Sequence, residues 1–350
     1  VNIVTKAASD EFEARFRVGA DSGPGYEAQG AISGPLSDSW KYRASLSYSD
    51  TDGYLDNTYL NTEADPYKDT TARVRFTYEP SDNVSGDFRV SYSEIDTTAL
   101  AFVINNDYGF PASVVGIDVT GPPNDPSDTS VPVRANNLGE GIKEMKGFSM
   151  KWDVQGDNGT FTSITAYDDL EEILTGDAFD FRPPPQSFNV LILGPSVAGP
   201  CAGGFIPPNV CQGLSMDWNQ SQFLEVETYS QEFRYTSDED GAFRWLAGAY
   251  LLGTDRFIGT GNMVDDGTLN RVFRSPRTNN GFPYDFSISN PQVTYLSLSQ
   301  DNFAWAVFGS MTYAFSDQWY ATFSLRYDED TREQTTETPP GFIPAALAAD

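Results

Sequence analysis

The sequence predicts an all-β membrane barrel in which antiparallel strands follow one another as an up-and-down meander. Three observations support this prediction. Apolar and polar residues alternate with a period of two, short and long connections alternate along the chain, and aromatic residues gather near both ends of the apolar faces. The alternating pattern appears in eleven segments, and no segment has the period of a convincing amphipathic helix.

The period of two is clearest in residues 12–20. Phe12, Phe16 and Val18 fall on one face there, and Arg15 and Arg17 fall on the other. The same division recurs in residues 40–48, 72–79, 88–92 and 319–327, and more weakly in 26–34, 146–154, 161–170, 226–236, 243–253 and 304–315. A lipid-facing exterior and a water-filled lumen impose this division on barrel strands.

The connections are sorted by length. Short turns rich in Gly, Pro, Asn, Asp and Ser occur at 34–38, 80–83, 155–159, 238–241 and 315–318. The connections between them are long at 50–69, 95–143, 171–224 and 255–302, and short only at 21–25. Because consecutive antiparallel strands reverse direction, every second connection lies at the same rim. We therefore expect the short turns in the periplasm and the long loops outside the cell, as in outer-membrane barrels.

Aromatic residues are placed as two girdles would require. One set falls near the short-turn rim: Trp40, Tyr78, Tyr235, Tyr313 and Trp319. A second set falls near the other rim: Tyr26, Tyr48, Tyr92 and Tyr327. The alternative is that these residues form the ordinary core of a soluble β-sandwich, but a sandwich has no reason to sort its loops by length.

Composition excludes several functions. The chain has 22 Lys and Arg against 50 Asp and Glu, a net charge of −28, which argues against a nucleic-acid partner. It has no histidine, so Ser-His-Asp and Cys-His catalytic sites and imidazole-dependent zinc sites are excluded. No apolar run approaches the ~18 residues of a membrane helix. Acidic clusters at 168–172, 238–240 and 265–266 lack a complete calcium-loop signature and are interpreted as solvated charges. We expect no enzyme activity, cofactor or metal site.

Two features of the long loops are candidate sites. Cys201 and Cys211 are the only cysteines, and we expect them to form a structural disulfide rather than a redox or metal site. Aromatic residues in the loops are candidates for stacking on an aromatic or sugar-like ligand, or for packing their own loops: Tyr108, Phe110, Phe179, Phe181, Phe188, Phe205, Phe282 and Tyr284.

The order of the strand and turn segments resembles a known family. The opening VNIVTK at 1–6 is similar to the end of a plug domain that leads directly into a barrel. Six further segments follow at strand-plus-loop spacing: YRASLSYSDTDGY at 42–54, ARVRFTYEPSDN at 72–83, FTSITAYDD at 161–169, YSQEFRYTS at 229–237, VFGSMTYAFSDQW at 307–319 and FSLRYDED at 323–330. Over about residues 1–330 the sequence resembles the TonB-dependent outer-membrane receptors of Gram-negative bacteria.

This resemblance implies a barrel of about 22 strands around a plug. Residues 1–8 would end the plug domain, and residues 9–350 would form the N-terminal half of the barrel, so we expect the chain to be a fragment. The implied function is active uptake of a scarce nutrient, such as a ferric siderophore, across the outer membrane. The implied partners are an extracellular small molecule, outer-membrane lipid and the inner-membrane TonB complex, which would act through the missing N-terminal part. Two alternatives are a passive porin and a secreted sugar-binding β protein.

Basic residues in the first quarter of the chain fall on the predicted inner face: Arg15, Arg17, Lys41, Arg43, Arg73, Arg75 and Arg89. They would dock a plug through charge-assisted hydrogen bonds. They could also attract an anionic substrate, or simply tolerate a wet lumen. Of these interpretations we favour plug docking.

Overall fold

The computed structural model describes residues 5–22, 24–98, 132–133, 135, 137–177, 217–238, 241–265 and 292–337. These residues form an 11-stranded sheet and one separate two-stranded hairpin. The strands are β1 (Glu13–Asp21), β2 (Gly25–Pro35), β3 (Trp40–Thr51), β4 (Asp56–Asn57), β5 (Thr62–Glu63), β6 (Tyr67–Ser81), β7 (Val84–Thr97), β8 (Glu140–Gly156), β9 (Gly159–Asp177), β10 (Asp217–Ser237), β11 (Phe243–Asp265), β12 (Gln292–Ser316) and β13 (Trp319–Thr336).

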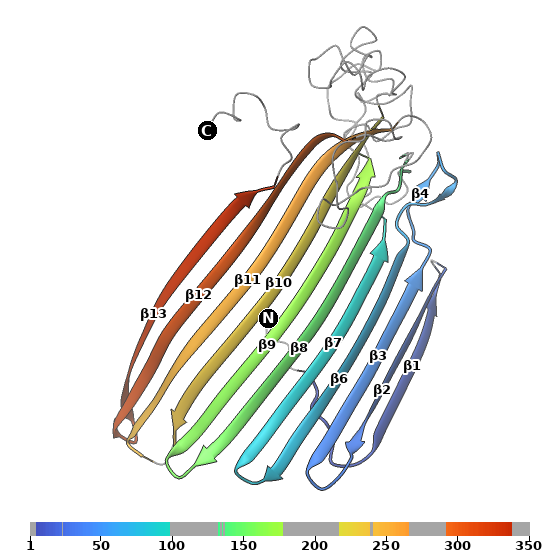
Figure 1. Cartoon of the computed structure of the whole chain (residues 1–350). Coiled ribbons are helices and arrows are strands. Elements are labelled where there is room, and N and C mark those ends of the chain that lie inside the picture. The colour runs from blue at the N-terminus through green and yellow to red at the C-terminus, as the bar shows by residue number, and fades with distance from the viewer. Residues whose placement is uncertain are drawn as a thin grey trace, which may run out of the picture.

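The large sheet is an antiparallel meander in which each strand pairs with the next large strand along the chain. It forms one curved wall of tilted strands, with β1 and β13 at its two edges (Figure 1). The predicted all-β class, the meander and the eleven strands are therefore confirmed. Within the described ranges, no helix is long and apolar enough to cross a membrane.

Most strands are longer than the alternation predicted, and the differences are largest in β10, β11 and β12. The pattern gave 226–236, 243–253 and 304–315, whereas β10, β11 and β12 all extend further toward the long loops. In these extensions both faces carry polar residues. Asp255 in the extension of β11, for example, pairs with Glu227, on the face that is apolar nearer the short-turn rim. The backbone hydrogen bonds between these strands continue in the extensions, although the alternation of apolar and polar residues has ended. The connections are correspondingly shorter, at 98–139, 178–216 and 266–291.

One face of the sheet is apolar and exposed. The register aligns Val74 with Val90, and Val90 with Phe148, in rows that run across neighbouring strands. Phe16, Val90 and Phe323 are 76%, 53% and 59% exposed. Apolar area left in water forgoes about 25 cal/mol per Å² of stabilisation, so a continuous face of this kind is suited to lipid. We call it the apolar face, and the opposite one the polar face.

The short turns all lie along one rim, at the lower edge in Figure 1. Backbone hydrogen bonds join neighbouring turns: Glu79 N–H to Ser39 O at 2.8 Å, Gln155 N–H to Asn83 O at 2.8 Å, Asp238 N–H to Asn158 O at 3.2 Å, and Ala314 N–H to Ala242 O at 2.8 Å. The connections 52–66, 98–139, 178–216 and 266–291 leave from the other rim. The predicted sorting of the connections is present.

Aromatic rings gather on the apolar face near both rims. At the short-turn rim, Trp40 stacks on Tyr78 with ring centroids 4.4 Å apart, and Tyr235 stacks on Trp245 at 5.3 Å. Toward the long-loop rim, the ring pairs are Tyr26–Tyr48 at 5.9 Å, Tyr167–Tyr229 at 5.1 Å and Trp305–Tyr327 at 5.6 Å. This distribution matches the two girdles of membrane barrels, whose interfacial rings sit between lipid tails and water.

Candidate functional site

The polar face carries a cluster of arginines on β1, β3, β6 and β7. We call this cluster the basic wall; it consists of Arg15, Arg17, Arg43, Arg73, Arg75 and Arg89, all predicted from the sequence to face inward. Side chains two residues apart share a face of a strand, which groups positions 15 with 17 and 73 with 75. The register then places Arg43 opposite Arg75, and Arg75 opposite Arg89. The structure thus brings the six arginines to one face of adjacent strands.

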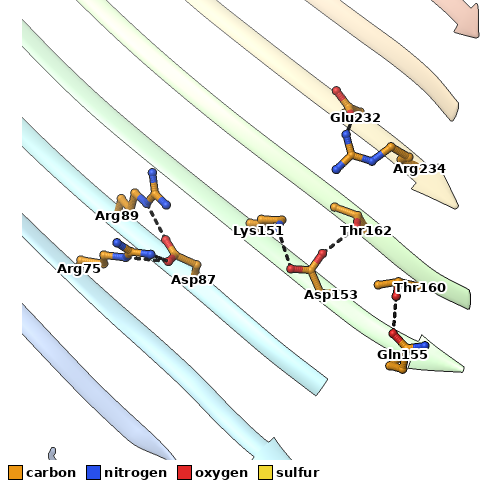
Figure 2. A network of polar contacts seen from close by, with 10 residues as sticks. All are labelled: Arg75, Asp87, Arg89, Lys151, Asp153, Gln155, Thr160, Thr162, Glu232 and Arg234. Carbon is orange, nitrogen blue, oxygen red and sulfur yellow. Dashed lines mark hydrogen bonds and ion pairs between the residues drawn. The ribbon is translucent and has the colours of Figure 1, made fainter. Parts of the chain in front are cut away.

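Part of the basic wall is neutralised by Asp87. Arg75 Nε donates to Asp87 Oδ2 at 2.7 Å, and Arg89 Nε donates to Asp87 Oδ1 at 2.6 Å (Figure 2). The Asp87 side chain is only 16% exposed, so these charge-assisted bonds are partly shielded from water. Asp87 was not among the residues predicted from the sequence. It precedes Arg89 by two residues and so shares its strand face, and this spacing could have predicted the pair.

Polar pairs continue along the polar face of β8, β9 and β10. Asp153 accepts from Thr162 Oγ1 at 2.6 Å and forms an ion pair with Lys151 at 2.7 Å (Figure 2). Arg234 forms an ion pair with Glu232 at 3.2 Å. Lys151 and Arg234 each have a carboxylate two residues away on their own strand, so the charges of these two cations are balanced locally.

Residues 5–12, which we call the entry segment, lie against the basic wall before β1 begins. The backbone N–H of Ser9 donates to Ser33 Oγ at 2.9 Å, and the Ser33 hydroxyl donates to Tyr42 O at 2.9 Å. Ser33 is fully buried. Nearer the N-terminus, Arg75 Nη1 donates to Thr5 O at 3.4 Å. The entry segment is therefore tied to β2 and β6, on the polar side of the sheet.

Ion pairs hold the same segment at its two ends. Lys41 Nζ lies 2.7 Å from Asp10 Oδ1 and 2.7 Å from Glu79 Oε2, so one ammonium group links the segment to β6. Lys6 Nζ lies 2.5 Å from Glu13 Oε2. Lys41 was predicted to face inward, and here it contacts the entry segment.

Two cavities open along the basic wall. The first, of about 620 Å³, is bordered by Thr5 and Lys6 of the entry segment and by four wall residues, Arg43, Arg73, Arg75 and Arg89. The second, of about 350 Å³, is lined by Arg15, Arg17, Gln29, Arg43, Ser45 and Arg73 among others. Arg43 and Arg73 line both.

The long-loop rim carries the β4–β5 hairpin, which was not predicted from the sequence because its strands span two residues each. The buried Asn57 side chain donates to Ala135 O at 2.8 Å, and its Oδ1 accepts from the N–H groups of Tyr59 and Leu60 at 3.0 and 3.1 Å. Val133 pairs with β4 through a parallel bridge. The loop 52–66 is thereby joined to the connection after β7.

Tyr54 extends this loop toward β1. Its hydroxyl donates to Asp21 Oδ1 at 3.2 Å, and its backbone N–H donates to Asp65 Oδ1 at 2.8 Å. The nearby Asp21 carboxylate raises the pKa of the Tyr54 phenol, because it disfavours the phenolate anion.

The predicted loop sites lie outside the described residues. This applies to Cys201 and Cys211 and to the loop aromatics Tyr108, Phe110, Phe179, Phe181, Phe188, Phe205, Phe282 and Tyr284. Of the acidic clusters, residues 168–172 belong to β9. In the part of the chain that the structure describes, no group of three or more potential ligands is arranged to hold a metal ion.

The arrangement of the strands is found in solved structures of outer-membrane receptors. One is the ferripyoverdine receptor of the outer membrane of Pseudomonas aeruginosa, with a TM-score of 0.60 and 12% identity, covering 95% of this chain and 39% of the receptor. The chain has the barrel fold of TonB-dependent outer-membrane receptors. No protein-family model and no curated protein matches the sequence.

Other receptors of this fold give the same result. The ferric yersiniabactin uptake receptor FyuA from Yersinia pestis aligns with a TM-score of 0.58 and 12% identity, over 95% of this chain and 44% of that one. The ferric-catecholate import receptor Fiu from E. coli K12 aligns with a TM-score of 0.60 and 9% identity, over 95% and 46%. The chain spans about two fifths of the length of such receptors. In this fold the polar face lines the lumen and the apolar face meets lipid.

Proposed function

We propose that this chain is part of a TonB-dependent receptor in the outer membrane of a Gram-negative bacterium. The receptor would take up a scarce nutrient such as a ferric siderophore and would perform no catalysis. The observation on which this rests most is the entry segment, which is bound across the polar face through Ser33, Lys41 and Arg75. A segment that enters the barrel from within the lumen is what a plug domain requires.

We assign residues 1–8 to the end of the plug and residues 9–350 to the first half of the barrel. In support, residues 5–12 precede β1 and contact the polar face instead of pairing as a further strand. The basic wall would then be the docking surface for the plug. Arg75, placed by the Asp87 carboxylate, already donates to the backbone of the entry segment.

The proposed mechanism follows from the two rims. The long loops would capture the nutrient outside the cell, and the inner-membrane TonB complex would pull on the plug through the part of the receptor that precedes this chain. The hydrogen bond at Ser33 and the ion pair at Lys41 would keep the end of the plug attached to the barrel while the rest moves.

Two alternatives fit fewer observations. A passive porin explains the apolar face and the sorted loops but has no use for a segment bound across its lumen. A secreted sugar-binding β protein would leave Phe16, Val90 and Phe323 in water, which the hydrophobic effect disfavours.

Uptake measurements in cells carrying the intact gene test the proposal. A panel of radiolabelled ferric siderophores is offered to cells with and without the inner-membrane TonB complex. We expect accumulation of at least one of them that requires both the gene and the complex. Accumulation that requires the gene but continues without the complex would indicate a porin and contradict the proposal.

A further inference from the structure

The arginines of the basic wall fall into two groups by their ionic partners. Arg75 and Arg89 share Asp87, and Arg17 Nη2 lies 2.8 Å from Glu27 Oε1. Arg15, Arg43 and Arg73, by contrast, have no acidic side chain within ion-pair distance among the residues that the structure describes. The contrast is unusual in a chain with a net charge of −28, where carboxylates far outnumber cations.

These three arginines line one cavity. The cavity of about 350 Å³ is bordered by Arg15, Arg43 and Arg73, and its lining contains no acidic residue. Three of the polar side chains that complete it supply hydrogen-bond donors: Gln29, Ser45 and Ser47. A cavity with this lining offers several positive charges and donor groups to one occupant, and it offers no carboxylate that would compete.

The positions of the arginines suit an oxyanion. Arg73 lies opposite Ser45 on β3, two residues along the strand from Arg43, and Arg15 lies opposite Ala31 on β2. The three guanidinium groups therefore originate from β1, β3 and β6, on the same face of the sheet, and line one cavity. Guanidinium forks bind carboxylate groups through paired hydrogen bonds, and these bonds strengthen where water is partly excluded.

We propose that Arg15, Arg43 and Arg73 form a binding site for carboxylate groups inside the barrel. The proposal rests on the proposed function in one respect, namely that the polar face lines the lumen. Two sources could supply the carboxylate: Asp or Glu side chains of the plug, which precede the entry segment, or an anionic nutrient that passes between plug and wall. Both present the same chemistry to the arginines.

Citrate binding to the intact, detergent-purified receptor tests whether a diffusible anion can supply the carboxylate. Titration calorimetry is done on the wild-type protein and on the variants Arg43→Gln and Arg73→Gln, which keep a hydrogen-bonding side chain but remove the charge. We expect binding in the wild type and a loss of about tenfold in affinity for each variant, as is typical of a hydrogen bond to a charged group. The control is Arg326→Gln on β13, because Arg326 is already paired with Asp328 at 2.7 Å.

Zero-length crosslinking tests the plug as the source. In the intact Arg73→Lys variant, a carbodiimide would join the lysine amine to any carboxylate in contact with it, and mass spectrometry would identify the partner. We expect a crosslink to an Asp or Glu that precedes residue 5 if the plug supplies the carboxylate. The matched control, Arg326→Lys, should give no such crosslink. Far-UV circular dichroism confirms that each variant retains its β structure.

The outcomes are distinct. Citrate binding that is weakened in both variants supports the site and assigns it to a diffusible anion. A crosslink from position 73 to the plug supports the site and assigns it to the plug. If neither occurs, or if Arg326→Gln weakens citrate binding as much as the wall variants do, the proposal is wrong. Neither measurement needs energised transport, so uptake that is independent of TonB would overturn the proposed function and leave this result standing.

Discussion

The Ser33 hydroxyl accepts a hydrogen bond from the backbone N–H of Ser9 at 2.9 Å, on the polar side of the sheet. Ser33 is fully buried, so water does not compete for this bond. The contact fixes the entry segment to β2 just before the chain turns into β1. This hydrogen bond therefore fixes the position at which the part of the chain that precedes Ser9 leaves the barrel wall.

Replacing Ser33 should loosen the entry segment and leave the sheet intact. Ser33→Ala leaves the Ser9 N–H and the Tyr42 carbonyl without their hydroxyl partner, at a cost of about 1–3 kcal/mol. In the intact protein, amide hydrogen exchange in residues 5–12 should become about tenfold faster. Ser85→Ala is the control, since within the described chain that hydroxyl makes no side-chain hydrogen bond. Equal exchange in both variants would show that the contact at Ser33 is unimportant.

Asp87 should matter more for stability than an exposed carboxylate in a similar pair. Asp87→Asn removes the negative charge that Arg75 and Arg89 share, and both Asp87 and Arg75 are mostly shielded from water. We expect the free energy of unfolding to fall by about 1–3 kcal/mol in a urea titration of the intact protein in detergent micelles. Asp328→Asn breaks a more exposed pair and should change it by less than about 1 kcal/mol. A larger loss of unfolding free energy in Asp328→Asn than in Asp87→Asn would contradict the structural role of Asp87.

The strand positions could be predicted because the two faces of a barrel strand meet different solvents. Val74 and Arg73 are neighbours in sequence and lie on opposite faces, and the alternation alone separates them. The pattern could not predict how far β10 and β11 extend, because polar residues there occupy both faces and the alternation is lost: Glu227 pairs with Asp255 on the side that is apolar nearer the short-turn rim. There the backbone ladder continues without a sequence signal.

The site was predictable only in part. The alternation placed the arginines on one face but could not tell which carboxylate neutralises which arginine. The roles of Asp87 and Ser33 depend on cross-strand register and on the path of the entry segment. A serine in a strand has no distinctive spacing. The importance of Ser33 arises from its hydrogen bond with the backbone N–H of Ser9, which lies 24 residues earlier in the chain.

The two cysteines should be oxidised in the native protein. Cys201 and Cys211 are the only thiols of the chain, and the loop between them would gain about 3 kcal/mol from closure in the chain-entropy model. Protein isolated from the outer membrane should therefore show no reaction with an alkylating reagent until a reductant is added. Complete alkylation of both residues without reductant would rule out the disulfide.

The assignment of faces predicts different effects for the same new residue at two nearby positions of β6. Val74→Arg places a charge on the apolar face, where an arginine at the bilayer midplane costs about 2–4 kcal/mol, and should impair assembly of the intact protein. Thr77→Arg places it on the polar face, opposite Asp87, and should be tolerated. The amount of folded protein in outer-membrane fractions measures both. Similar losses in the two variants would mean that the faces are wrongly assigned.

We expect the sheet to span the outer membrane with its long connections outside the cell. This orientation is tested by the accessibility of an epitope inserted, one site at a time, into the full-length protein. Insertions within 98–139, 178–216 and 266–291 should be labelled by antibody on intact cells. Insertions at the turns 82–83, 238–241 and 317–318 should be labelled only after the outer membrane is permeabilised. Labelling of a long connection and a short turn from the same side would contradict the membrane barrel, and with it the proposed transport.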